Sequence, residues 1–422
     1  MSQIPMKYTT QQQSRFAHEC AIGDVFGRAP IYDLIFSCVS PRTLVRTGRS
    51  CRAAYHASKD FSHRAYNIHR HLSHFLSKPL AFRNLQARTG TLIAGSNALQ
   101  FLDRTFYPEA DMDIYVHPGH VREVLDYLVE REGYKFKPDK TQPEDYREIV
   151  SDEWDGTRIR ALAPDDDEFL QYYQIKGVQN VLSVEKRGLR GTLKIQLIAC
   201  ETSPFETIVN FHSTCVMNFI AFDAAYSLYP VATFEDKDTL SIWRARPLHD
   251  LTVVIKYGER GFRWLPTLPS TSTQTSPFHP FTDRTVGDQY TWRMSLDTEG
   301  VDLHPQMNSS SSLIQCDPVI YNGWSLEHIH DGMGTIYKTI KSTVFRYSYT
   351  TTNRKLHFKL CLFAFEQGFL SRILLQNNLL EKENWPWFDA ELATFWENFE
   401  HDFVSLIPRD STQYLIQGFC AQ

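Results

Sequence analysis

The stretch LIAGSNALQFLDRTFYPEADMDIYV, residues 92–116, decides the fold that we expect. A short apolar strand pattern ends at Gly95 and Ser96, and a helical pattern follows. A second strand pattern, MDIYV, then begins beside two aspartates, Asp111 and Asp113, that are separated by one residue. Alternate residues of a strand point to the same face, so these two carboxylates can share metal ions. The Gly-Ser pair offers close backbone approach, a hydroxyl group and the first amides of a helix to phosphate oxygens.

This combination of groups favours a site for a nucleoside triphosphate. Transfer of a phosphoryl or nucleotidyl group needs oxygen ligands that hold Mg²⁺ beside the phosphates, because the metal neutralises their charge. We therefore predict that Asp111 and Asp113 are the metal-binding and catalytic residues. Gly95 and Ser96 are the predicted nucleotide-binding residues.

The order of strand, Gly-Ser, helix and Asp-x-Asp strand resembles the nucleotidyltransferase fold of the DNA polymerase beta superfamily, over roughly residues 80–260. Fourteen residues separate Ser96 from Asp111, which is a slightly long spacer for this pattern. Two segments resemble the sequences of fungal proteins of this group, namely GSNALQFLDRTFYPEADMDIYV and FHSTCVMNFIAFDAAYSLYP. The resemblance implies a mixed sheet flanked by helices, Mg²⁺ as the cofactor and a nucleoside triphosphate as the ligand. It also implies transfer of a nucleotidyl group to a small molecule or a protein.

Active members of the superfamily carry a third carboxylate on a later strand. The matching strand here is TLKIQLIAC, residues 192–200, and its inward polar position is Gln196. An amide oxygen can coordinate a metal but carries no charge and cannot act as a general base. Two interpretations stay open: catalysis is weakened, or another segment supplies the third strand. Glu201, Glu206 and Asp223 follow downstream, but none of them holds the strand position.

Two later segments add candidate ligand contacts. We expect residues 211–229 to be helical, with Ser213 facing the nucleotide or lying on a purely structural helix. Residues 247–262 have a helical pattern that carries Lys256 and Tyr257. Lys256 would supply a cation for the triphosphate and Tyr257 a ring for the base, or both residues simply edge a helix.

Near the N-terminus, PIYDLIFSCVSPRTLVRTGRSCR, residues 30–52, shows short amphipathic helical patterns separated at Ser40 and Pro41. The segment resembles an F-box, the helical motif that docks substrate receptors on the Skp-type adaptor of cullin ubiquitin ligases. Alternatively, its apolar residues pack the helical module against the rest of the protein. The residues that the resemblance assigns to partner binding are Ile31, Leu34, Ile35 and Leu44.

Charge is distributed unevenly along the chain. Residues 1–90 contain 13 Lys and Arg against 4 Asp and Glu, so the totals of 44 and 49 leave 31 against 45 elsewhere. Because nucleic-acid binding needs a broad basic surface, we expect a small ligand or a protein partner and no extended nucleic-acid surface. The eight cysteines form no CxxC pair, which is typical of reduced thiols. No apolar run approaches the ~20 residues of a membrane helix, so we expect no membrane association and a cytoplasmic or nuclear location.

The predicted fold class is α+β, with a nucleotidyltransferase-like mixed sheet. Five regions are expected: a mobile tail 1–27, a helical F-box-like module 28–79, a nucleotidyltransferase-like domain 80–265, a loop-rich segment with some strands 266–354, and a helical C-terminal region 355–422. Three functions remain open at this point. The chain is an active nucleotidyltransferase, a catalytically inactive scaffold that serves as an F-box-type substrate receptor or ligand sensor, or a structural interaction protein that keeps the motif by descent.

Overall fold

The structure is a computed structural model that describes residues 22–140, 142–149, 177–188, 191–242, 247–269, 271–272, 275–302, 317–329, 332–377 and 387–395. Most of the expected tail 1–27 and the end of the expected C-terminal helical region therefore lie outside the described residues. The chain divides into two compact units. Unit 1 contains residues 1–71 and 103–105, and unit 2 contains residues 72–102 and 106–422.

Unit 1 is helical in its described part, as the sequence predicts. Ser40 caps the second of its helices by accepting a hydrogen bond from the Thr43 N–H at 3.2 Å, and Pro41 takes the first helical position. Aromatic and aliphatic side chains from three helices share a small core, namely Tyr32, Phe36, Leu44, Ala57 and Phe61. The helices are α2 (Ala29–Ser37), α3 (Pro41–Gly48), α4 (Arg52–Ala65) and the start of α5 (Ile68–Leu72).

Unit 2 is built on a mixed eight-stranded sheet, which confirms the α+β class. The strand order is β11-β7-β6-β1-β2-β5-β4-β3. Only the central pair β2–β5 is parallel among these strands, and every other pairing in this sheet is antiparallel. The strands are β1 (Leu92–Ala94), β2 (Met112–Val116), β3 (Lys135–Lys137), β4 (Val178–Arg187), β5 (Thr192–Cys200), β6 (Asn218–Ile220), β7 (Ala224–Ser227) and β11 (Trp292–Ser295).

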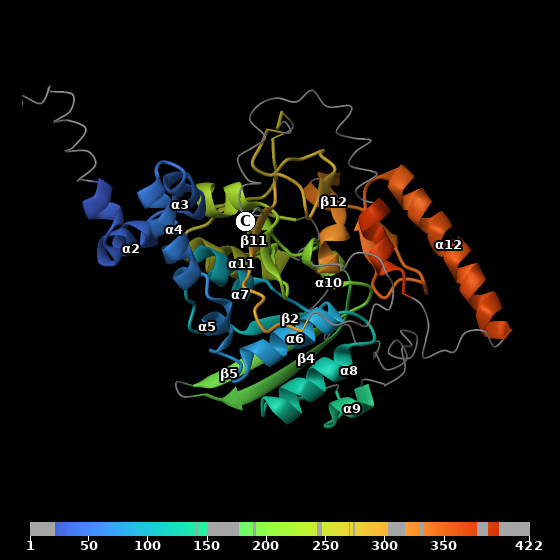
Figure 1. Cartoon of the computed structure of the whole chain (residues 1–422). Helices are drawn as coiled ribbons and strands as arrows, with labels where there is room; N and C mark the ends of the chain where they lie inside the picture. Colours follow the sequence, from blue (N-terminus) through green and yellow to red (C-terminus); the bar gives the residue numbers. More distant parts are fainter. Residues whose placement is uncertain are drawn as a thin grey trace, which may run out of the picture. The chain divides into compact units, whose positions relative to one another are not determined.

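The β4–β5 hairpin is the longest antiparallel pair of this sheet and is drawn in green in Figure 1. Its turn is closed by a 2.8 Å hydrogen bond from the Gly188 N–H to the Gly191 carbonyl oxygen. Apolar residues at alternate positions, such as Val184 and Ile195, are fully buried, so the hairpin has one face on the core. Two strand patterns separated by a short segment with two glycines, Gly188 and Gly191, predict this hairpin, and the structure confirms it and places β5 beside β2.

Helices pack around the sheet and end at recognisable signals. The amphipathic pattern that begins at Val121 forms α8 and a short π-helical turn, then ends at Gly133 with φ +75°. Its buried residues Val124 and Leu125 place α8 against β5. The helices of this part are α6 (Pro79–Thr89), α7 (Ser96–Asp103), α8 (Val121–Asp126), α9 (Tyr146–Ile149), α10 (Pro204–Ile208) and α11 (Pro247–Glu259), with η1 (Tyr127–Arg131), η3 (Thr214–Val216) and η4 (Val231–Asp236).

The predicted helix over residues 211–229 is wrong. This segment forms the 3₁₀ turn η3 and then strands β6 and β7, which pair with each other. All side chains of both strands are buried, because the strands lie inside the sheet with both faces covered. An apolar run of this kind lacks the alternation that distinguishes a strand from a buried helix.

The later part of unit 2 contains smaller sheets and a long helix. The predicted C-terminal helix is confirmed as α12 (Arg354–Gln376), which begins at the cap residue Asn353. Strand β11 of the expected loop-rich segment joins the main sheet beside β7. The remaining elements are β8 (Asp238–Leu240), β9 (Arg263–Leu265), β10 (Arg284–Thr285), β12 (Gly323–Ile329), β13 (Gly332–Ile336), β14 (Lys338–Ile340), β15 (Tyr349–Thr351), η5 (Pro318–Tyr321) and η7 (Asp389–Glu391).

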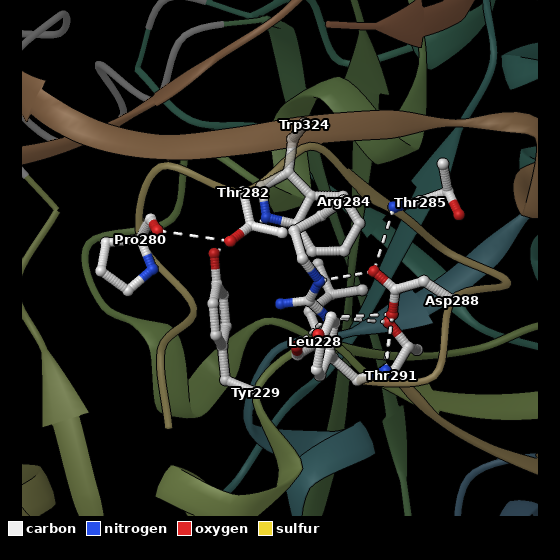
Figure 2. A network of polar contacts seen from close by, with 10 residues as sticks. Leu228, Tyr229, Pro280, Thr282, Arg284, Thr285, Asp288, Thr291 and Trp324 are labelled. Carbon is white, nitrogen blue, oxygen red and sulfur yellow. Dashed lines mark hydrogen bonds and ion pairs between the residues drawn. The ribbon is translucent and has the colours of Figure 1, made fainter. Parts of the chain in front are cut away.

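A buried arginine anchors this later part to the sheet (Figure 2). The guanidinium of Arg284 donates to the Leu228 carbonyl oxygen at 3.1 Å and forms an ion pair with Asp288. The Trp324 ring lies 4.9 Å from Arg284 Cζ, and its Nε1 donates to the Tyr229 hydroxyl at 2.8 Å. Because the Arg284 side chain is fully buried, these contacts fix β10 and β12 against the end of β7.

Membrane-spanning helices are absent from the part of the chain that the structure describes. None of the helices there is both long enough and apolar enough to cross a bilayer.

Candidate functional site

The Gly-Ser turn and the Asp-x-Asp strand lie together in unit 2. Strands β1 and β2 pair so that Ala94 is opposite Asp113, and Gly95 follows directly with φ +69°. A side chain at Gly95 would place its Cβ 3.2 Å from Asp113 Oδ2, so glycine leaves room for the carboxylate and permits the left-handed turn. Ser96 then begins α7, whose first turn is closed by a 3.1 Å bond from the Leu99 N–H to the Gly95 carbonyl oxygen.

Gln196 lies beside Asp113 across the one parallel strand pair of the main sheet. The β2–β5 register pairs Asp113 with Gln196, and neighbouring in-register side chains project from the same face of a sheet. Asp111 is two residues before Asp113 and belongs to the same side of the strand. The three side chains are partly accessible, whereas their strand neighbours Met112 and Ile195 are fully buried. The polar face at this end of the sheet therefore presents two carboxylates and one amide.

Asp113 is held in an environment that disfavours its charge. Burial, followed by repulsion from Asp111, raises the pKa of Asp113 to about 7. The ammonium groups of Lys256 and Lys194 act in the opposite direction on this pKa. A carboxyl group with a pKa near neutrality releases its proton to solvent readily when a cation binds to it, and perturbed pKa values of this kind are common at functional sites.

Lys194 is a site residue that our reading of the sequence missed. Its Nζ lies 3.3 Å from Asp111 Oδ2, and both side chains are 35% exposed. Spacing offered a signal, because Lys194 is two residues before Gln196 and must project from the same face of β5. A lysine on the face of the two aspartates is part of their electrostatic environment.

The cation predicted from the sequence, Lys256, lies on the exposed side of α11, and the neighbouring Tyr257 is buried. The ring of Tyr257 is therefore not available to stack on a base, contrary to the expectation from the sequence. The same turn of chain carries Arg260, whose Cζ lies 3.8 Å from the ring centre of Tyr107. Arg260 also pairs with Glu109 at 3.2 Å, so the long spacer before Asp111 packs against the end of α11.

Several downstream candidates are buried or bonded to other residues. Ser213 is fully buried, and its Oγ lies 3.7 Å from Cys215 Sγ, so the structure does not expose it to a ligand. Glu206 accepts hydrogen bonds from the Tyr337 and Thr339 hydroxyls at 3.2 and 3.3 Å. Asp223 is buried and pairs with Arg293 at 2.9 Å. Neither acid replaces the carboxylate that is absent at Gln196.

The donor set fits one magnesium ion. Mg²⁺ prefers hard oxygen ligands and is commonly held by one or two carboxylates together with water and phosphate oxygens. Asp111 and Asp113 supply two carboxylates, and Gln196 supplies a neutral amide oxygen beside them. Among the residues that the structure describes, no group of three or more His, Cys, Asp or Glu side chains comes together. Two carboxylates and one amide oxygen leave the other coordination positions of such an ion to water or phosphate oxygens.

The candidate docking residues of unit 1 divide into two groups. Leu34 on α2 is 72% exposed, and Ile31 and Ile35 of the same helix are also exposed. Leu44 is buried in the unit 1 core, so it cannot contact a partner and the expectation for this residue is wrong. A surface of three aliphatic side chains on one helix remains.

Comparisons of the chain with protein-family models, with curated proteins and with solved structures find no match. A fold alone does not define an activity, because one fold hosts many functions. The geometry of Gly95, Asp111, Asp113, Lys194 and Gln196 is therefore the basis for a functional proposal.

Proposed function

We propose that the protein is nucleotidyltransferase-like and binds a nucleoside triphosphate together with Mg²⁺. The observation that carries this proposal is the approach of Gly95 to Asp113, with 3.2 Å between a Cβ built at Gly95 and Asp113 Oδ2. At this approach, a turn of the type that binds phosphate lies next to a strand of the type that binds metal ions. Neither feature alone indicates a nucleotide, but their contact supplies the two halves of one site.

Each residue of the site has a distinct role in this proposal. Asp111 and Asp113 hold Mg²⁺, and the bound ion supplies neutralisation of the phosphate charge. The backbone approaches closely at Gly95, and the amides and the hydroxyl at Ser96 donate hydrogen bonds to phosphate oxygens at the start of α7. Lys256, exposed on α11, contributes a mobile positive charge to the triphosphate.

Catalysis by this site is limited by Gln196. Transfer of a nucleotidyl group requires the acceptor to lose a proton as it attacks the phosphorus, and an amide cannot accept that proton. The site therefore supports nucleotide binding better than transfer. Transfer to a small molecule or a protein remains the activity to test.

Thermal unfolding with each nucleoside triphosphate and Mg²⁺ tests the binding proposal. A ligand that binds the folded state raises the unfolding temperature by mass action, and the rise should be absent in an Asp111→Ala, Asp113→Ala double variant. Transfer is tested by incubation with labelled nucleotides under the same conditions. Equal label on the natural protein and the double variant would remove the catalytic role of the aspartate pair.

One observation favours a second candidate, a catalytically inactive scaffold that acts as an F-box-type receptor for a ubiquitin ligase. Leu34 is 72% exposed on α2, beside two further exposed aliphatic residues of that helix. Solvent-exposed aliphatic side chains gathered on one helix mark an interaction surface more often than isolated ones do. A pulldown with a Skp-type adaptor tests this candidate.

A further inference from the structure

Lys194 occupies a position that decides how many cations the site can hold. Its ammonium group lies 3.3 Å from Asp111 Oδ2, and Asp113 also experiences its charge. The position is fixed by the sheet, because Lys194 belongs to β5 and the register places Ile195 beside Met112 and Gln196 beside Asp113. The strand thus delivers a positive charge to the place where Asp111 would otherwise meet a metal ion.

The charges of the site explain what this lysine does. Ionised Asp111 and Asp113 together with Lys194 and Lys256 carry no net charge. A site with three carboxylates and one lysine would carry two negative charges, which is the charge that one divalent cation neutralises. With an amide at Gln196 and an ammonium group at Lys194, the site therefore has the net charge of a site with three carboxylates and one lysine that already holds one divalent ion.

We propose that Lys194 is a built-in counter-ion that takes the place of a divalent cation at Asp111 until a nucleotide brings one Mg²⁺ into the site. This inference rests on the proposed nucleotide-binding function. A free divalent ion gains little at an electrically neutral site, whereas a triphosphate meets two lysines there. The metal enters mainly with the nucleotide, and Lys194 contributes to holding the phosphates.

The Lys194–Asp111 pair is suited to such an exchange. Both side chains are 35% exposed, and ion pairs of this kind contribute little to stability. Moving the ammonium group from Asp111 to a phosphate oxygen therefore costs little. Asp111 is then released to the one metal ion that arrives with the nucleotide.

The test uses the full chain and compares Lys194→Met with Lys135→Met, which removes the same charge from an exposed position on β3. Binding of Mn²⁺ alone is followed by the spin-resonance signal of the free ion. Binding of a non-hydrolysable ATP analogue is followed in the presence of a chelator. Both are measured at about pH 8, where Asp113, whose pKa is about 7, is ionised. Lys194→Arg keeps the charge and reports on unrelated effects of substitution.

Loss of the Lys194 charge should change the affinities for Mn²⁺ and for the metal-free nucleotide in opposite directions. Lys194→Met should bind Mn²⁺ about tenfold more tightly and the metal-free nucleotide about tenfold more weakly, whereas Lys135→Met and Lys194→Arg should match the natural protein. No change in Mn²⁺ affinity, or a weaker affinity, would overturn the role of Lys194. If no variant binds nucleotide under any condition, the proposed function fails instead, and the Mn²⁺ titration still decides whether Lys194 acts as the counter-ion.

Discussion

Asp113 on β2 and Gln196 on β5 are partners in register across the only parallel strand pair of the main sheet. Their side chains share one face of the sheet, at the end where Gly95 approaches the Asp113 carboxylate. This pairing places a neutral amide where a carboxylate would complete a set of three acids. The proposed binding of Mg²⁺ and of a nucleotide, and the limit on catalysis, all rest on that relationship.

Gln196→Glu should strengthen metal binding. Glutamate has nearly the shape of glutamine, so the added negative charge beside Asp113 should tighten Mn²⁺ binding by about tenfold with little effect on folding. The measurement is a Mn²⁺ titration at about pH 8, with Gln196→Met as a control of similar size and no charge. Equal affinities in the two variants would show that position 196 does not face the ion.

Asp113→Asn should change how stability depends on pH. The pKa of Asp113 in the folded protein is raised to about 7, above the value of about 3.9 in an unfolded chain, so the folded state binds the extra proton between these values. The natural protein should therefore lose stability relative to Asp113→Asn as the pH rises from about 4 to about 7. Urea unfolding of both proteins across this range measures the difference between their free energies of unfolding. The titration of other groups contributes equally to both proteins and cancels in this difference. A difference that does not vary with pH would mean that the carboxylate is not perturbed.

Gly95→Ala should affect both stability and ligand binding, and the chain offers a matched control. Gly95 has φ +69° and Gly133 has φ +75°, so alanine at either position should cost about 1 kcal/mol in the free energy of unfolding. Only at Gly95 would the new Cβ lie within 3.2 Å of Asp113 Oδ2, since the space around Gly133 is open. Chemical unfolding should thus show similar losses, while nucleotide binding should weaken in Gly95→Ala alone. Equal nucleotide affinities for the two variants would contradict the close approach of turn and carboxylate.

Arg284→Leu should destabilise the protein strongly. Its guanidinium is fully buried, and its removal would leave Asp288 without the ion pair shown in Figure 2. Breaking a buried pair by removing one partner costs about 3–5 kcal/mol. The exposed pair of Arg147 and Glu130 is the control, and Arg147→Leu should cost less than about 1 kcal/mol. Similar losses in the two variants would show that the Arg284 network does not anchor β10 and β12.

Leu34→Glu should abolish binding to a Skp-type adaptor if unit 1 works as an F-box. Leu34 is 72% exposed, so a charge there should leave the free energy of unfolding nearly unchanged. Leu251→Glu introduces the same change at an exposed leucine of α11 and should bind the adaptor like the natural protein. Equal adaptor capture by both variants would argue against docking through α2.

Local patterns in the sequence predict much of this fold. The Gly-Ser turn, the Asp-x-Asp strand, the β4–β5 hairpin and α12 all follow from periodicity and end signals within short segments. The helix prediction for residues 211–229 is wrong because a buried apolar run is compatible with either a helix or strands. The pairing of β11 with β7 and the Arg284–Trp324 contact join residues far apart in the sequence, so no local sequence pattern predicts them.

The candidate site shows the same division. Gly95, Asp111 and Asp113 are read from one stretch, and Gln196 follows once β5 is recognised. Lys194 could be found from its spacing to Gln196, but its contact with Asp111 depends on the register of β2 and β5. The burial of Ser213 and Tyr257 follows from tertiary packing, which the polarity of a residue does not reveal.

Calorimetric titration of the chain with a non-hydrolysable ATP analogue and Mg²⁺ tests the central claim most directly. The account predicts saturable binding with one nucleotide per chain, and a loss of at least about tenfold in affinity in Asp111→Asn, Asp113→Asn, because two charged metal ligands are lost. Binding of equal affinity in the natural protein and the double variant would contradict the claim, as would the absence of binding to the natural protein.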